Sequence, residues 1–537
     1  MGARGVMIKT GFSQTKKSAK EEKLLRSWIS LLIFLPFLFL AIIYVKTSFH
    51  LLFIHNDIGY PEGASVYSFL TTMRTGKLYS LPFDFPFNGQ MYGPVFYLIG
   101  TLCAKAAHSD PMLTAERFRS LSFLSFFGSS VIIGWLAWKL EGRIRWAISS
   151  AVLSLACVWE LNFASSARPD ELSIFLILAA LAVYQVSRGR SCLVFWVGVL
   201  ASLSWLTKQS TVPVLIALLI DSFIGRRFRD SAALIVGNVP VPALIGFTMW
   251  FRREPFIDNF LLVRNSHFEM HGALILLISF VRTNQIAIIP FTLAVLGIGL
   301  SWRKERYRAI LLAAGLSWFA NVAALANIGG DKNYLLLPWL LTASLVPAGL
   351  VRLEESARRS AMIPLGVTLL GGVLLIHQRN VLFPKVVSSL DTRNVEKLKI
   401  LSGLPYLEMR SREPELLDPF LYRLLSLQKV WSFNFIVEQI DREEFDLILI
   451  KGRDDPSDSK FLVENFRGDS YWGEETLGPM ASHYRGLCEL RGFDGSDQIA
   501  LVPRHRSSVL QDKDISRIFG QPCLATNLIP QLDPGVF

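Results

Sequence analysis

Apolar runs long enough to cross a membrane recur along the first 377 residues of this chain, and they limit its fold more than any other feature. Most of these runs have about 17 or more residues, a length that as a helix crosses the roughly 30 Å hydrocarbon core of a bilayer. The 537 residues are 51% hydrophobic and only 18% charged, which is too apolar for an ordinary soluble protein. We therefore expect a mainly α-helical, polytopic membrane protein.

Positive charge in the connectors predicts how the chain crosses the bilayer, because Lys and Arg collect on the cytoplasmic side. With a cytoplasmic N-terminus, about eleven spans place the Arg- and Lys-rich connectors 139–145, 187–190, 225–230, 302–308 and 352–359 inside. The predicted spans are about 28–49, 118–138, 146–166, 171–187, 191–207, 211–224, 231–251, 286–302, 307–327, 334–351 and 362–377. Two shorter apolar runs, 92–107 and 272–280, are predicted to be juxtamembrane helices in the outer leaflet, because a span at 92–107 would invert the later connectors.

The composition changes after residue 377, where charged residues and prolines become frequent and no apolar run reaches spanning length. We predict three parts: a basic cytoplasmic segment 1–27, a transmembrane domain 28–377 with a first outer loop 50–117, and a soluble domain 378–537 on the outer side. Alternating apolar residues at 445–453 and 497–504 predict strands, and 418–440 has helical periodicity. This mixture predicts a small α/β or α+β domain.

Charge and composition also exclude some functions. The formal net charge of +11 is dispersed over short connectors, which membrane orientation explains better than a nucleic-acid partner. His267 and His271 are four residues apart, but no third ligand is evident. We therefore predict no metal site at these histidines. A divalent cation as a cofactor stays open at the level of sequence, although no motif indicates one.

The five cysteines do not form a recognisable framework. Cys103, Cys157 and Cys192 lie in apolar segments, and only Cys488 and Cys523 lie in the soluble tail. Whether these last two form a disulfide stays open at the level of sequence.

The connectors predicted to lie outside carry many charged residues close to span ends. These residues include Arg168, Asp170, Lys208, Asp331 and Lys332. Each one alone is explained by a loop charge or by a side chain that reaches from the interface into water. Together they predict a shared outer cavity, with the cations needed to bind a phosphate and a carboxylate to deprotonate a hydroxyl.

These segments resemble the polytopic C-type-fold (GT-C) glycosyltransferases of the family 39-like group, which include the protein O-mannosyltransferases and the aminoarabinose transferases of lipid A. Five motifs carry the resemblance over residues 28 to about 350: HNDIGYPEG (55–63), GKLYSLPFDFPFNGQMYGPVFYLIG (76–100), ARPDE (167–171), TKQS (207–210) and GGDKNYLLLP (329–338). The chain departs from many relatives at Tyr92-Gly93-Pro94, where they have Tyr-Pro-Pro. This departure leaves the acceptor class open.

The resemblance implies transfer of a sugar from a polyprenyl-phosphate donor to the hydroxyl of a lipid, glycan or protein acceptor, with inversion at the anomeric carbon. Asp57 matches the position of the family's catalytic acid and is the predicted base. The predicted phosphate-binding residues are Lys208, Arg168 and Lys332, and the predicted substrate-binding residues are Glu62, Asp170, Gln209, Asn333 and Tyr334. The expected location is a bacterial inner membrane, with the active site facing the periplasm.

Two other functions fit the same general pattern. A secondary transporter also has many spans with buried charges, but it usually places them near the middle of broken helices and shows two related halves. The charges here gather at one face, and we see no internal repeat. A flippase or polymerase of lipid-linked glycans shares the lipid phosphate, and the sequence leaves it open.

Overall fold

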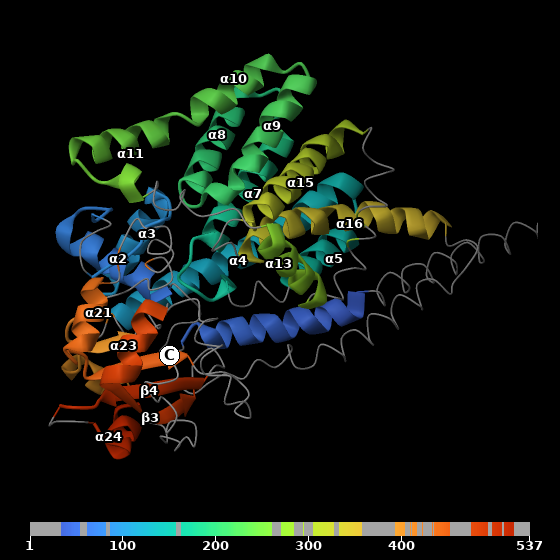
Figure 1. The fold of residues 1–537 in the computed structure, drawn as a ribbon. Coiled ribbons are helices and arrows are strands. Elements are labelled where there is room, and N and C mark those ends of the chain that lie inside the picture. Colours follow the sequence, from blue (N-terminus) through green and yellow to red (C-terminus); the bar gives the residue numbers. More distant parts are fainter. Residues whose placement is uncertain are drawn as a thin grey trace, which may run out of the picture.

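The structure is a computed structural model of the full chain (Figure 1). It describes residues 34–53, 62–81, 86–156, 163–259, 270–283, 291, 294, 304–326, 332–356, 392–402, 409, 411–415, 422, 432, 434–451, 474–491, 497–506 and 510–519. Asp57, the predicted base, lies outside the described residues, as do Asp331, His267 and Cys523.

The described residues before residue 357 form helices joined by connectors. They are the helix Phe34–Leu51, α2 (Glu62–Thr75), α3 (Pro94–Ala106), α4 (Pro111–Glu141), α5 (Ile144–Leu155), α7 (Asp170–Ser187), α8 (Ser191–Trp205), η1 (Gln209–Thr211), α9 (Val212–Ile224), α10 (Phe228–Gly237), α11 (Pro240–Phe251), α13 (Met270–Thr283), α15 (Glu305–Ala324), η3 (Lys332–Leu335) and α16 (Leu336–Ser356). Figure 1 shows α7, α8 and α9 side by side, next to α15.

Five of the described helical segments are long and apolar enough to cross a membrane. They are Phe34–Leu51, Pro111–Glu141, Asp170–Ser187, Phe228–Phe251 and Glu305–Ala324. The mainly helical, polytopic fold predicted from the sequence is therefore confirmed. The count of eleven spans stays a prediction, because most of 286–302 and all of 362–377 lie outside the described residues.

Several predicted bounds differ from the observed helices. The predicted span 231–251 divides into α10 and α11 at Pro240, because proline lacks an N–H donor and disfavours a helical residue before it. Helix α5 ends at Leu155, earlier than predicted. Helix α4 begins seven residues before its predicted span, at Pro111, where Oδ1 of Asp110 accepts a hydrogen bond from Leu113 N at 2.6 Å and caps the helix.

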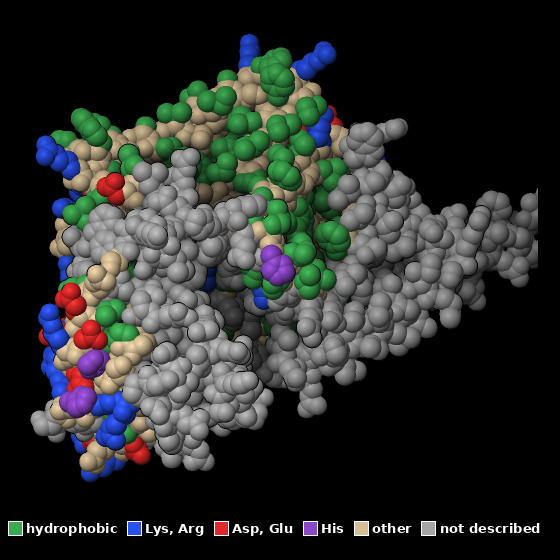
Figure 2. Space-filling view, viewed as in Figure 1, with side chains coloured by type: hydrophobic (Ala, Val, Ile, Leu, Met, Phe, Trp, Pro, Cys, Tyr) green, Lys and Arg blue, Asp and Glu red, His purple; other side chains and the backbone are tan. Residues whose placement is uncertain are grey.

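Large apolar side chains cover the outside of the helical part. Trp250, Phe251 and Phe319 are 75–78% exposed, and apolar side chains spread over the helices in the upper half of Figure 2. A soluble protein rarely leaves so much apolar surface in water, whereas lipid tails cover it readily. The outer surface therefore agrees with an integral membrane protein.

A small mixed sheet forms the C-terminal part of the described chain. Its strands are β1 (Ile400–Ser402), β2 (Leu447–Lys451), β3 (Tyr484–Arg491) and β4 (Asp497–Pro503), in the order β1-β2-β4-β3. β1 and β2 are parallel, and the other two pairs are antiparallel. The described helices of this part are η5 (Thr392–Lys397), α21 (Asn434–Asp441), α23 (Glu474–His483) and α24 (Asp512–Phe519). The predicted small domain of mixed helices and strands is confirmed.

This C-terminal domain packs against the segment that follows α2. Phe87 is 1% exposed and lies in one hydrophobic cluster with Tyr422, Ile436 and Met480. Its ring centroid is 5.1 Å from that of Tyr422, and its N–H donates to Glu415 O at 3.0 Å. The predicted first outer loop thus supplies a buried side chain to the core of the C-terminal domain, which places both at the same end of the helical bundle.

Candidate active site

The connectors form two groups, one at each end of α7. Within each group the connectors contact one another. At the end that begins with Asp170, the segment after α2 meets the segment after α11. Leu78 N donates to Glu254 Oε2 at 3.0 Å, and Asn259 Nδ2 donates to Ser80 O at 2.9 Å. Partial burial raises the pKa of the Glu254 carboxyl, while the Leu78 N–H opposes this shift. These contacts join two connectors that were both predicted to lie outside.

At the other end of α7, four connectors predicted to lie inside contact one another. Arg188 Nη1 donates to Glu305 O at 3.2 Å, and Gly189 N donates to Asp230 Oδ2 at 2.8 Å. The Tyr307 hydroxyl donates to the Glu141 carboxylate. The alternation predicted from Lys and Arg therefore agrees with which connectors meet in space.

A buried aspartate gathers the cations at this second end. The carboxylate of Asp221 accepts hydrogen bonds from Arg227 Nη2 at 2.5 Å, Arg308 Nε at 2.6 Å and the Tyr184 hydroxyl at 2.8 Å. Arg188 Nη2 is 3.8 Å from the same carboxylate. We refer to Tyr184, Arg188, Asp221, Arg227 and Arg308 as the Asp221 cluster.

A second buried aspartate lies at the first end, at the first residue of α7. Asp170 Oδ1 pairs with Lys208 Nζ and accepts from Asn333 Nδ2 at 2.9 Å, while Arg168 Nε is 3.4 Å from Oδ2. The side chains of Asp170, Lys208 and Arg168 are 2%, 7% and 11% exposed. We refer to Arg168, Asp170, Lys208 and Asn333 as the Asp170 cluster. Three separate connectors supply it, as the sequence predicted for an outer cavity.

Further predicted site residues flank the Asp170 cluster. Lys208 Nζ is 4.9 Å from the ring centroid of Tyr334, a cation–π distance. Gln209 begins η1 directly after Lys208, and Lys332 begins η3. Gln209, Lys332 and Tyr334 are half-buried, so they form the more open margin of a nearly closed cluster.

The chain beneath Lys208 packs closely against Gly93. Gly93 N donates to Thr207 O at 3.3 Å, and Val95 N donates to Leu206 O at 3.1 Å. A Cβ atom at position 93 would overlap the carbonyl oxygen of Leu206. The glycine that distinguishes Tyr92-Gly93-Pro94 from Tyr-Pro-Pro thus lets the first outer loop approach the segment that carries Lys208.

Glu62 is fully engaged by groups from two other segments. Its two carboxylate oxygens accept from Arg119 Nε at 2.9 Å and from Arg119 Nη2 at 2.7 Å, and Oε1 also accepts from Ala167 N at 2.6 Å. Both side chains of the ion pair are 2% exposed. Glu62 therefore anchors the start of α2 to α4 and to the segment before Asp170.

Two residues of this region were not among the predicted site residues. Arg119 lies near the start of the apolar helix α4, where a charge is itself a signal of function or of a specific partner. Glu171 is fully buried beside Asp170, and among the described residues neither of its carboxylate oxygens has a hydrogen-bond partner. The motif ARPDE contains Glu171, but only its neighbour Asp170 was predicted to be a substrate-binding residue.

The chemistry of the Asp170 cluster suits an anion better than a metal. An ammonium, a guanidinium and an amide group already occupy the Asp170 carboxylate, so a divalent cation would have to displace them. Lys208, Arg168 and Asp170 together carry a charge of +1 by count, which the adjacent buried carboxyl of Glu171 leaves unchanged only in its protonated form. In a site that excludes water, such a charge interacts strongly with a phosphate.

The helices and the C-terminal sheet together match a solved structure, ArnT from Cupriavidus metallidurans bound to undecaprenyl phosphate. The match covers 88% of this chain and 98% of that chain, with a TM-score of 0.51 and 13% sequence identity. The chain has an ArnT-like fold. This confirms, for the fold, the resemblance to the GT-C aminoarabinose transferases that the sequence motifs suggested.

The structure of ArnT from the same organism in the apo state aligns over 90% of this chain, with 12% identity and a TM-score of 0.48. No protein-family model and no curated protein matches the sequence. The ArnT-like fold is therefore a likeness of structure at low sequence identity.

Proposed function

We propose that this protein is an integral membrane glycosyltransferase that moves a sugar from a polyprenyl-phosphate donor to an acceptor hydroxyl. The observation that carries the proposal is the Asp170 cluster, in which two buried cations converge within an ArnT-like fold. The ArnT structure of this fold is bound to undecaprenyl phosphate. A polyprenyl phosphate is therefore the natural candidate for the lipid that this chain binds.

Lys208, Arg168 and Lys332 bind the donor phosphate in this proposal. Asp170 pairs with Lys208 and is itself bonded by the Asn333 amide, and the ring of Tyr334 covers the Lys208 ammonium group. A cation held in a site with little water stabilises charge as it develops on the departing phosphate. The half-buried residues Lys332, Gln209 and Tyr334 line the more open margin, where the sugar and the lipid phosphate approach.

Asp57 acts as the base. The acceptor oxygen forms a bond to the anomeric carbon, the bond between that carbon and the phosphate oxygen breaks, and the acceptor proton passes to the Asp57 carboxylate. The polyprenyl phosphate leaves with the bonding electrons, and the configuration of the anomeric carbon inverts. Asp57 is five residues before Glu62, which is anchored to Arg119 and Ala167.

The active site faces the outside of a bacterial inner membrane in this proposal. The second end of α7 carries three arginines around Asp221, as expected of a cytoplasmic face. Cys488 in the C-terminal domain is disulfide-bonded, which suits the oxidising periplasm.

The positions of the charges argue against the transporter alternative. The Asp170 cluster and the Asp221 cluster lie at opposite ends of α7 rather than at its middle. Transporters place their substrate sites near the midplane, at breaks in helices. An enzyme that takes a lipid-linked donor from one leaflet needs its charges at one face, which is where the Asp170 cluster lies.

Transfer by an Asp57→Asn variant tests the proposal. The purified protein is incubated with lipid-linked sugars extracted from membranes of the source cells, together with the lipid and glycan fraction of those cells, and released polyprenyl phosphate is measured by mass spectrometry. We expect wild type to release it and Asp57→Asn to lose the activity.

Asp110→Asn is the matched control. Asp110 caps α4, and its side-chain acceptor bonds Leu113 N at 2.6 Å, a role that Asn performs equally well. This variant should keep wild-type transfer. Wild-type transfer by a folded Asp57→Asn variant would refute the assignment of the base, and absence of release by wild type would refute the proposed reaction.

A further inference from the structure

Two histidines and a glutamate converge at one edge of the C-terminal domain. Single ligand atoms of Glu443, His483 and His505 all lie within 4.8 Å of one another. Glu443 follows α21, His483 ends α23 immediately before β3, and His505 follows β4. Histidine, acidic and basic side chains gather over this domain in Figure 2. The sequence did not indicate the cluster, because its members are 40 and 22 residues apart and form no spacing motif.

The backbone holds these three residues close together. Arg504 N donates to His483 O at 2.9 Å, which pairs the residue before His505 with His483. His505 N donates to Glu443 Oε2 at 3.0 Å. Glu443 itself has φ of 52°, a left-handed conformation that is uncommon for a residue with a side chain. The positions of the three side chains therefore follow from the fold of the domain and not from one flexible contact.

The burial of the three side chains differs in a way that suits a site filled from solvent. The Glu443 side chain is 8% exposed, the His483 side chain 34% and the His505 side chain 76%. The carboxylate thus forms the base of the cluster, and the imidazole of His505 covers it from the water side. A metal ion can reach the carboxylate from solvent after a small outward movement of this one exposed ring.

We propose that Glu443, His483 and His505 bind a Zn²⁺ ion. Two imidazoles and one carboxylate are a known zinc ligand set, with water in the fourth position. His505 Nδ1 and Glu443 Oε1 are 2.7 Å apart, somewhat less than the roughly 3.3 Å between two ligands of a tetrahedral zinc with bonds of about 2.0–2.1 Å. A zinc ion between these two atoms would replace the proton of their hydrogen bond. The replacement requires only a small outward movement of the exposed His505 ring.

Asp441 supplies a further carboxylate beside this site. Its Oδ1 is 3.5 Å from Nε2 of His483. Carboxylates next to a metal-binding histidine orient the ring and strengthen its binding to the metal. Asp441 precedes Glu443 by two residues, so the same helix end presents both carboxylates.

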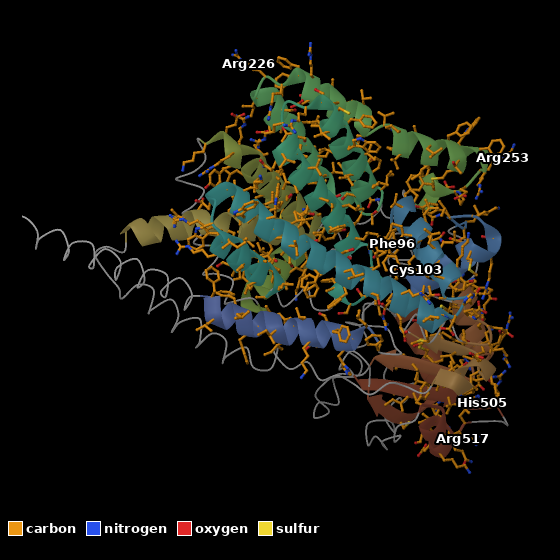
Figure 3. The ribbon with its side chains drawn as sticks, turned by 180° about the vertical axis from the view of Figure 1, so that it is seen from behind. Phe96, Cys103, Arg226, Arg253, His505 and Arg517 are labelled. Atoms are coloured by element: carbon orange, nitrogen blue, oxygen red, sulfur yellow. The ribbon has the colours of Figure 1, made fainter. Side chains whose placement is uncertain are left out.

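The zinc site is separate from the proposed active site. Figure 3 labels His505 on the C-terminal domain, away from Cys103 and Arg226, which lie in the helical part. The three ligands join the ends of α21, α23 and β4. Bound zinc therefore cross-links three segments of the C-terminal domain, and we expect it to stabilise that domain rather than to take part in sugar transfer.

Zinc titration of the full-length protein tests the proposal. The protein is purified in detergent with its affinity tag removed, stripped with EDTA and dialysed, and then titrated with Zn²⁺ by calorimetry, with the bound zinc counted by elemental mass spectrometry. We expect one zinc per chain and a rise in the melting temperature of wild type. His505→Gln and His483→Gln should each weaken the affinity by about tenfold or more and remove most of the thermal shift.

His108→Asn is the matched control, since it removes an exposed histidine whose φ of 52° Asn also adopts readily. It should bind zinc like wild type. Because His505 is largely exposed, its replacement leaves the apo protein folded, and circular dichroism verifies this. Zinc binding that persists unchanged in both glutamine variants, or wild type that binds no zinc at all, would overturn the proposal.

Discussion

A cluster around a buried aspartate lies at each end of helix α7. The two clusters differ in the number, type and exposure of the cations that face the aspartate. At the Asp221 cluster, three arginines surround one carboxylate, and their side chains are 17–23% exposed. At the Asp170 cluster, one lysine and one arginine face the carboxylate, and both are at most 11% exposed. The 18 residues of α7 place the two clusters about 27 Å apart along its axis.

This difference separates a structural cluster from a candidate binding site. Long arginine side chains at the Asp221 cluster reach water while they pair with the buried aspartate, so they join the helix ends that meet there. The cations of the Asp170 cluster are nearly closed off from water. Asn333 bonds the Asp170 carboxylate that pairs with Lys208, and the ring of Tyr334 lies against the Lys208 ammonium. Such a fixed and desolvated charge is costly to bury. In the proposed function it binds the donor phosphate.

Removing the carboxylate should have the largest effect, and the effect should differ between the two ends. Asp170→Asn leaves Lys208 buried without its partner, and we expect a loss of about 3–5 kcal/mol in stability together with loss of transfer. Asp221→Asn should destabilise less, because its arginines can turn toward water, and each folded molecule should keep its turnover. Thermal unfolding in detergent and transfer per folded molecule measure the two effects.

The double variant Asp170→Asn/Lys208→Met distinguishes stability from function. It removes the unpaired charge together with its partner, so it should recover most of the stability that Asp170→Asn loses. It should remain inactive, because the phosphate ligand is gone. Recovery of both stability and transfer would show that the Asp170 cluster, like the Asp221 cluster, is only structural.

Glu62 offers a second test of structural against binding roles on the Asp170 side. Glu62→Gln removes the carboxylate charge that lies 2.7 Å from the buried Arg119 guanidinium, so we expect a loss of about 3 kcal/mol or more in stability. Glu62→Gln/Arg119→Met keeps an acceptor for Ala167 N and removes the guanidinium. If Glu62 is only an anchor, this double variant regains stability and transfer. A well-folded but inactive double variant would instead assign Glu62 to substrate contact.

The close packing beneath Lys208 should make the Asp170 side more sensitive to a single methyl group. Gly93→Ala drives Cβ into the backbone of Leu206, whereas at Gly225 a Cβ would meet chiefly the side-chain ends of Arg227 and Arg308, at 3.0 Å. We expect Gly93→Ala to cost about 1–3 kcal/mol and to lower transfer by displacing Lys208. Gly225→Ala should cost about 0.5 kcal/mol or less. Equal melting temperatures for the two variants would contradict this account.

The features that recur along the chain, namely apolar runs and positively charged connectors, were predictable from the sequence. The apolar runs and the alternation of Arg-rich connectors predicted the helices and which connectors meet, because lipid and membrane charge act on each segment locally. The converging residues Arg168, Asp170, Lys208 and Asn333 were also predicted. The motif order that resembles the GT-C enzymes, more than any single residue, pointed to them.

Pairings between distant segments were not predictable in the same way. The ion pair between Glu62 and Arg119 joins residues 57 positions apart. Arg119 lies within the predicted span 118–138, where nothing in the sequence indicated a partner. The insertion of Phe87 into the C-terminal domain depends on a cavity that forms only after that domain folds. The histidine cluster was hidden for the same reason, since its three members come together only when α21, α23 and β4 pack.

Binding of undecaprenyl phosphate to Lys208→Met and Arg308→Met tests the central claim most directly. Both changes remove one cation from a buried aspartate, one at each end of α7, and native mass spectrometry of each variant in detergent with added lipid measures the affinity. We predict that Lys208→Met weakens binding by about 10- to 100-fold, the equivalent of one charge-assisted hydrogen bond, and that Arg308→Met binds like wild type. Equal affinity in the two variants, or a loss only in Arg308→Met, would contradict the assignment of the donor phosphate to the Asp170 cluster.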